Sequence, residues 1–178
     1  MQFKKLVDLI GNTPLVESVN LVKNKNVKLL LKLEGNNPGG SVKDRAAYNM
    51  IASAIERGDI KKGDKLIEAT SGNTGISFSA IGRALGHDVK IIMPDWLSKE
   101  RIDIIKSLGA EDILVSREQG GCLGSIALCE KMARENSRVF LPRQFENCFN
   151  TTSTPQRKRN KLFGFDISTY IHSESRCL

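Results

Sequence analysis

The lysine at position 43 has a setting in which a lysine could act as a nucleophile. It follows the turn-rich stretch Gly35–Gly40 and begins a segment with helical spacing, for which Ser41 is the expected N-cap. A lysine attacks carbonyl groups when burial or a neighbouring cation lowers its pKa, and Arg45 is close in sequence. Taken alone, however, Lys43 fits a solvated helix surface better than a catalytic role.

A second stretch, Thr70–Gly75, has the composition of an anion-binding loop. It reads Thr-Ser-Gly-Asn-Thr-Gly and lies between a short apolar strand and an apolar helical segment. Backbone N–H groups and the hydroxyls of Thr70, Ser71 and Thr74 therefore meet at the positive end of a helix dipole. In open parallel sheets, ligands bind beyond the carboxyl ends of the strands, which is where this loop should lie. The loop fits a bound carboxylate or phosphate, and it fits a helix cap with nothing bound equally well.

Several other kinds of site are not indicated. The sequence after Gly40 is Ser-Val-Lys rather than the Gly-Lys-Ser/Thr of a Walker A loop, and no Gly-x-Gly-x-x-Gly follows a strand. The four cysteines form no Cys-x-x-Cys pair and have no histidine nearby, so we expect reduced thiols and no metal site.

Composition and charge are those of a soluble globular protein. Of 178 residues 40% are hydrophobic, and the mean hydropathy is -0.25. The net charge of +7 divides into +4 over residues 1–149 and +3 over residues 150–178, so no nucleic-acid partner is expected. No apolar run reaches the roughly 18 residues of a membrane span, and the first residues lead into no apolar signal core. We expect a cytoplasmic protein without a membrane partner.

The elements that position the two loops alternate along the chain. Strands are expected over 27–33, 65–69, 89–93, 112–116 and 138–141, and helices over 41–58, from the Thr70 loop to about 86, over 98–108 and over 122–134. This order implies an α/β fold in which helices cover both faces of a parallel sheet. Residues 150–178 are polar and then basic without an apolar period, so we expect this tail to be poorly ordered.

Taken together, the two loops resemble the cysteine synthase family of pyridoxal-phosphate enzymes, fold type II. The matching segments are Gly11–Leu15, Glu34–Arg45, Thr70–Gly75, Met93-Pro94 with Glu100-Arg101, Leu108–Glu111 and Gln144–Asn147, in the family's order. The stretch Asn36–Arg45 is nearest the B branch of the family. The resemblance covers residue 1 to about residue 149.

The resemblance implies a role for each residue of the two loops. Lys43 would be the Schiff-base lysine that holds pyridoxal 5'-phosphate and moves the substrate α-proton, and Asn73 would contact the ring hydroxyl of the cofactor. The amino-acid carboxylate would be held by Thr70, Ser71, Gly72, Thr74 and Gln144. The implied reaction is β-replacement, in which O-acetylserine loses acetate and gains sulfide or thiosulfate. Family members are usually homodimers.

The resemblance also implies that part of the family pattern is missing. The loop that holds the cofactor phosphate and the serine facing the pyridine nitrogen should follow residue 150, and neither is found. We therefore expect a truncated or frameshifted chain, or a fragment of a split gene, with little or no activity. Residues 1–38 would belong to an incomplete large domain and residues 39–143 to a three-layer small domain. Strands near Leu15 and Leu30 would lose their partners and promote aggregation.

Two other functions stay open. The chain could be a non-catalytic remnant or binding module that uses the small domain or the basic tail. It could also be another pyridoxal-phosphate lyase, similar to cystathionine β-synthase or threonine dehydratase, because the residues that separate these enzymes lie mostly in the missing part of the pattern.

Overall fold

The computed structural model describes residues 5–18, 20–21, 23–24 and 26–152, so the basic tail from residue 153 onward lies outside the described residues. The strands are β1 (Leu15–Glu17), β2 (Leu30–Lys32), β3 (Lys65–Ala69), β4 (Asp88–Pro94), β5 (Glu111–Val115) and β6 (Val139–Phe140). The helices are α1 (Lys43–Arg57), α2 (Asn73–Ala84), α3 (Lys99–Ser107), α4 (Gly121–Glu135) and α5 (Cys148–Thr152), with 3-10 turns η1 (Leu6–Leu9) and η2 (Glu34–Asn36).

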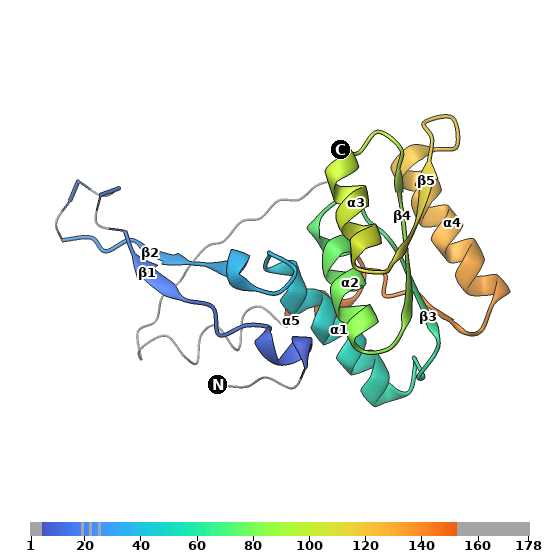
Figure 1. The fold of residues 1–178 in the computed structure, drawn as a ribbon, viewed down its shortest axis with the longest axis horizontal. Coiled ribbons are helices and arrows are strands. Elements are labelled where there is room, and N and C mark those ends of the chain that lie inside the picture. Colours follow the sequence, from blue (N-terminus) through green and yellow to red (C-terminus); the bar gives the residue numbers. More distant parts are fainter. Residues whose placement is uncertain (1–4, 19, 22, 25, 153–178) are drawn as a thin grey trace.

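The body of the molecule is a parallel sheet between two layers of helices, as the sequence predicts (Figure 1). The strand order is β5-β4-β3-β6, and all neighbouring pairs are parallel. Alternate side chains of β3 enter two cores: Leu66 packs with α1, α2 and α3, whereas Ile67 packs with α4. This alternation explains why a strand buried on both faces reads as a nearly continuous apolar run.

The strand order changes direction between β3 and β6. From β3 the chain proceeds through β4 to β5 on one side, and it then returns through α4 to place β6 on the opposite side of β3. The strand order therefore reverses at the β3–β6 pair, so the carboxyl ends of these two strands mark the switch point of the sheet. In open α/β sheets this switch point is where ligands bind.

Most element boundaries differ from the sequence predictions by one to three residues, and three differences concern the predicted site and the tail. The N-cap of α1 is Val42, one residue after the predicted Ser41, and it makes no side-chain cap bond. The predicted loop Thr70–Gly75 is shorter, because α2 already begins at Asn73. The first residues of the expected tail, 150–152, belong to α5.

The strands β1 and β2 form an antiparallel arm that extends from the body (Figure 1). The strands near Leu15 and Leu30 therefore pair with each other, whereas the sequence suggested strands without partners. Exposed apolar side chains remain on this arm, among them Val16 at 44% and Leu31 at 38% exposure. Among the helices that the structure describes, none has the length and apolar character to cross a membrane.

Candidate functional site

Lys43 is the first residue of α1, and its side chain is half-buried. Its backbone N–H donates to the Ser41 hydroxyl at 3.2 Å. The next residue, Asp44, is fully buried and accepts hydrogen bonds from the Ser77 hydroxyl and the Gly39 N–H, each at 2.5 Å. Asp44 thus joins the glycine-rich turn to α2 immediately beside Lys43. Burial raises the pKa of Asp44 above its ordinary value, although these two donors oppose the rise.

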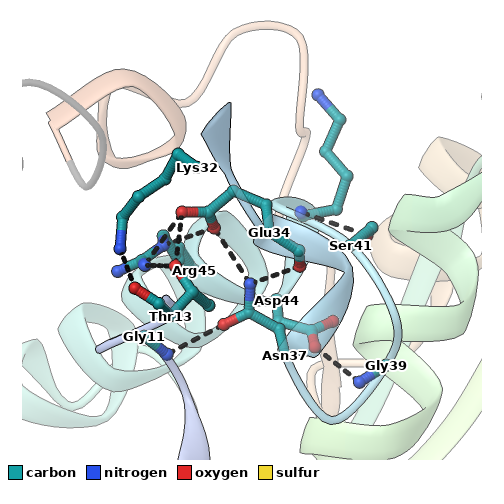
Figure 2. A network of polar contacts seen from close by, with 10 residues as sticks. Gly11, Thr13, Lys32, Glu34, Asn37, Gly39, Ser41, Asp44 and Arg45 are labelled. Carbon is teal, nitrogen blue, oxygen red and sulfur yellow. Dashed lines mark hydrogen bonds and ion pairs between the residues drawn. The ribbon is translucent and has the colours of Figure 1, made fainter. Parts of the chain in front are cut away.

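A largely buried ion pair fixes the other side of the glycine-rich turn (Figure 2). The Arg45 guanidinium donates from Nε to Glu34 Oε2 at 2.8 Å and from Nη2 to Glu34 Oε1 at 3.0 Å. Both side chains are about 15% exposed. The sequence suggested Arg45 as a cation that could lower the pKa of Lys43, but its guanidinium is engaged with Glu34. Arg45 therefore acts as a structural partner of the turn.

The same carboxylate collects donors from three segments of the chain (Figure 2). The Thr13 hydroxyl donates to Glu34 Oε1 at 3.0 Å, and the Asn37 amide donates to Glu34 Oε2 at 2.9 Å. The side-chain oxygen Oδ1 of Asn37 accepts the Gly11 N–H at 2.8 Å. Burial raises the pKa of Glu34, but Arg45, Asn37 and Thr13 outweigh burial and bring the pKa down to about 2. The segments that precede β1 and α1 are therefore locked together through an ionised carboxylate.

The Thr70 loop lies at the switch point between β3 and β6. Thr70 is buried; its N–H donates to the Ile92 carbonyl at 3.1 Å, and its hydroxyl accepts the Gly72 N–H at 3.4 Å. Gly72 is the N-cap of α2 and provides no side-chain cap bond. Thr74 is buried in the first turn, whereas Asn73 is exposed. An N-terminus without a side-chain cap is suited to an anion, since its N–H groups and the helix dipole favour negative charge.

Gln144 comes to the same place from the turn after β6. Its side chain is buried, and its Nε2 donates to the Ala69 carbonyl at 2.9 Å. Its backbone N–H donates to the carboxylate of Glu68 at 3.2 Å. The structure thus places Gln144 directly against the residue that precedes Thr70. The carboxylate-binding set predicted from the sequence, Thr70, Ser71, Gly72, Thr74 and Gln144, comes together at one edge of the sheet, while the role of each residue stays a prediction.

Sequence reasoning missed three carboxylates that hold these segments in place, namely Glu34, Asp44 and Glu68. Only Glu68 could have been recognised from the sequence, because a glutamate is unexpected in the apolar strand Leu66-Ile67-Glu68-Ala69. Its partner Gln144 is 76 residues away in the chain, so local patterns could not reveal the contact. Among the described residues, no group of three or more His, Cys, Asp or Glu side chains is arranged to hold a metal ion.

Comparison with known proteins agrees with this geometry. Cysteine synthase B of Escherichia coli is 47% identical over 156 residues, which is 85% of this chain and 51% of the relative. The crystal structure of cysteine synthase from Entamoeba histolytica matches with a TM-score of 0.81 at 40% identity, over 86% of this chain and 46% of that one. A hydrogen sulfide-producing enzyme from Fusobacterium nucleatum matches with a TM-score of 0.77 at 47% identity, over 83% and 44%.

These matches confirm the resemblance and the α/β fold predicted from the sequence. The chain spans about half the length of the curated relatives it matches. The model of one family, described as pyridoxal-phosphate dependent enzyme, matches residues 6–154, which is most of the chain. The protein therefore belongs to the family of pyridoxal-phosphate dependent enzymes.

Proposed function

We propose that this chain supplies the lysine and the carboxylate-binding side of a cysteine synthase active site. The proposed reaction is β-replacement on O-acetylserine, in which acetate leaves and sulfide or thiosulfate enters. The observation that carries the proposal is the position of α2. The loop that leads into α2 begins directly after Ala69, to which Gln144 is bonded, and Ser77 of α2 is bonded to the residue that follows Lys43. The names of the relatives, which include cysteine synthases, support the same class of reaction.

The residues present fit pyridoxal phosphate on its reactive side. Lys43 offers a half-buried primary amine at the start of α1, and Asn73 offers an exposed amide at the start of α2. Lys43 would bind the aldehyde, and Asn73 would contact the ring hydroxyl. When bound, the cofactor supplies an electron sink for the substrate α-carbon.

The protein's own contribution is orientation and proton transfer. The carboxylate of the substrate would lie at the N-terminus of α2, where Thr70, Thr74 and the backbone at Gly72 offer donors and the helix dipole favours negative charge. Gln144, fixed to Ala69, would complete this site. The Lys43 amine would accept the α-proton as the acetate group departs from the β-carbon, which is general-base catalysis by a positioned lysine.

Titration with pyridoxal phosphate tests the lysine assignment, because cofactor capture requires the described residues rather than full turnover. Binding of the aldehyde to an amine gives a visible absorption band distinct from that of the free cofactor. We expect this band in the unaltered chain and its loss in Lys43→Ala. The matched control is Lys99→Ala, since Lys99 is also the first residue of a helix but is exposed on α3. Equal bands in both variants would show that Lys43 has no special role.

Addition of O-acetylserine then tests the substrate side. We expect it to change the band of the loaded protein, and we expect Gln144→Ala to require a higher O-acetylserine concentration for the same change. If O-acetylserine leaves the spectrum unchanged while Lys43 still captures the cofactor, the proposed substrate is wrong and the cofactor assignment remains.

A further inference from the structure

We propose that Glu68 is the positioning residue of the carboxylate-binding site, because its buried carboxylate fixes the turn that carries Gln144 against the carboxyl end of β3. This inference rests on the proposed function for its meaning in catalysis. The positioning itself concerns only residues of this chain.

Glu68 occupies an anion-binding turn made by the protein's own backbone. Its side chain is 3% exposed, and its two carboxylate oxygens accept the N–H groups of Ala69 at 3.1 Å and Gln144 at 3.2 Å. Arg143, which precedes Gln144, has a φ of 53°, which is unusual for a residue other than glycine. Successive N–H groups in such a turn form a concave site for an anion. Here the anion is a side chain from the neighbouring strand.

The contact is reciprocal, so β3 and the turn constrain each other. While the Gln144 N–H donates to Glu68, the Gln144 side chain donates to the carbonyl of Ala69 at 2.9 Å. The amide of Asn150 donates to the Gln144 carbonyl at 2.6 Å from the other side. Glu68 is the ionisable member of this set. Its carboxylate form accepts the N–H groups that hold a turn whose backbone conformation carries strain at Arg143.

The protonation state of Glu68 decides how well its carboxyl group can accept the N–H groups of the turn. As a carboxylate it is an acceptor only, whereas a protonated oxygen presents a donor to the N–H groups and weakens the clamp. Burial raises the pKa of Glu68 to about 7, although the N–H groups of Gln144, Ala69 and Arg143 and the charge of Arg143 act against the rise. Cys129 of α4 is a further ionisable group near Glu68, and burial, with the charges of Glu68 and Glu130, raises its pKa to about 12. Glu130 of α4 forms an ion pair with Arg143, with 4.0 Å between Glu130 Oε1 and Arg143 Nε. Near neutral pH, then, Cys129 stays a neutral thiol while Glu68 titrates.

Amide NMR of the cofactor-free chain tests the positioning directly. We expect the backbone amides of Ala69 and Gln144 to shift together with a midpoint near pH 7, and we expect this titration to be absent in Glu68→Gln. In that variant the amides of residues 70–74 should shift as well, since the carboxylate links both loops. A general loss of packing would not produce a shared midpoint in the unaltered protein.

A second substitution separates positioning from simple packing. Arg143→Gly removes the cost of a positive φ, so in the Glu68→Gln background it should restore the amide shifts of residues 70–74 in part. Bound to pyridoxal phosphate, Glu68→Gln should also bind O-acetylserine about tenfold more weakly, the effect of one unsatisfied buried N–H.

Two results would overturn the proposal. One is a Gln144 amide that does not follow the titration of Glu68, and the other is a set of Thr70 loop amides unchanged by Glu68→Gln. By contrast, if the amides respond as expected but the loaded protein ignores O-acetylserine, the positioning by Glu68 stands and the proposed substrate fails.

Discussion

Buried carboxylates near the predicted site differ in what balances their charge. Glu34 meets the Arg45 guanidinium at 2.8 Å, and its pKa falls to about 2 although burial alone would raise it. Glu68 meets backbone N–H groups instead of a cation in contact, and burial leaves its pKa at about 7. Glu68 is also more deeply buried than Glu34, so its higher pKa reflects both a larger desolvation and the lack of a bidentate cation. Ionised Glu34 therefore stabilises the folded state, whereas ionised Glu68 lowers its stability.

Removal of the Glu34 charge should destabilise the protein. In Glu34→Gln the largely buried Arg45 would lose its anionic partner, and the expected cost of about 1–3 kcal/mol lies between that of an exposed pair and that of a fully buried one. Urea denaturation at neutral pH measures this loss. The control is Asp59→Asn, which breaks the exposed ion pair between Arg57 and Asp59 and should change stability by at most about 1 kcal/mol.

The pH dependence of the same pair gives a second check. Since the pKa of Glu34 is lower in the folded state than its ordinary value of 4.5, its contribution is present above pH 4.5 and is lost as the pH falls through about 2. Equal acid sensitivity of the unaltered protein and Glu34→Gln would contradict this assignment.

Glu68 should show the opposite pH dependence. Its folded pKa of about 7 lies above the ordinary 4.5, so the folded state holds the proton more tightly than the unfolded state. The contribution of Glu68 to stability is therefore full below pH 4.5 and is lost as the pH rises through 7. Relative to Glu68→Gln, the unaltered protein should lose roughly 3 kcal/mol of unfolding free energy between pH 4.5 and pH 8. Urea titrations of both proteins at these pH values measure it, and parallel curves would refute it.

At the scale of elements, α2 owes its position to small residues on the face that packs against the sheet. Gly82 is buried in α2, and a Cβ at this position would lie 2.6 Å from Cγ2 of Val89 on β4. Val89 is itself only 2% exposed and has a stiff branched side chain. The close approach of α2 to β4 therefore requires glycine here, although glycine lowers the intrinsic stability of a helix.

Gly82→Ala should destabilise the protein by about 1–3 kcal/mol, because the overlap with Val89 exceeds the gain in helix propensity of roughly 1 kcal/mol. Thermal or urea unfolding measures this. Val89→Ala is the matched background, since it removes the methyl group that Gly82→Ala would meet. In the Val89→Ala background, Gly82→Ala should lower the free energy of unfolding only slightly, or should raise it. Additive losses in the double variant would show that the contact is not the cause.

Some element boundaries could be predicted from the local sequence, and others could not. The strand over Lys65–Ala69 matches its prediction, because a short apolar run between polar turns has few other conformations. The predicted cap at Ser41 is one residue early, since the Ser41 hydroxyl accepts the Lys43 N–H while Val42 occupies the cap. Tertiary contacts of Asp44 with Gly39 and Ser77 shape this helix start, and no local pattern contains them.

At the scale of the whole molecule, the β1–β2 arm exposes apolar surface outside the main sheet (Figure 1). Val16 pairs directly with Leu31, and Leu30 and Leu33 add further exposed apolar side chains. A two-stranded arm with such a face tends to associate with other chains. The chain should therefore self-associate as its concentration rises.

Val16→Thr with Leu31→Lys should reduce this association, because both changes make the same face of the arm polar. Light scattering coupled to size-exclusion chromatography at low and high concentration measures the effect. Leu123→Lys is the control: Leu123 is 78% exposed on α4, away from the arm. A monomer at every concentration in the unaltered chain would contradict the expectation, as would an equal effect of the control.

Sequence alone predicted the parallel α/β body and the gathering of the Thr70 loop with Gln144, the latter through family resemblance. It could not predict what holds them. The clamp between Glu68 and Gln144 spans 76 residues, and the contact between Thr13 and Arg45 spans 32. Such contacts depend on strand order and on the path of the chain, whereas apolar periodicity reports only which faces are buried.

The central claim is that Lys43 is the residue that captures pyridoxal phosphate, and chemical trapping tests it most directly. Borohydride reduction after incubation with less than one equivalent of cofactor would fix it to its lysine, and peptide mass spectrometry would locate the label. We expect the label to lie on Lys43 and to be abolished by Lys43→Ala but not by Lys99→Ala. A label distributed over exposed lysines, with Lys43 no more modified than Lys99, would contradict this role of Lys43.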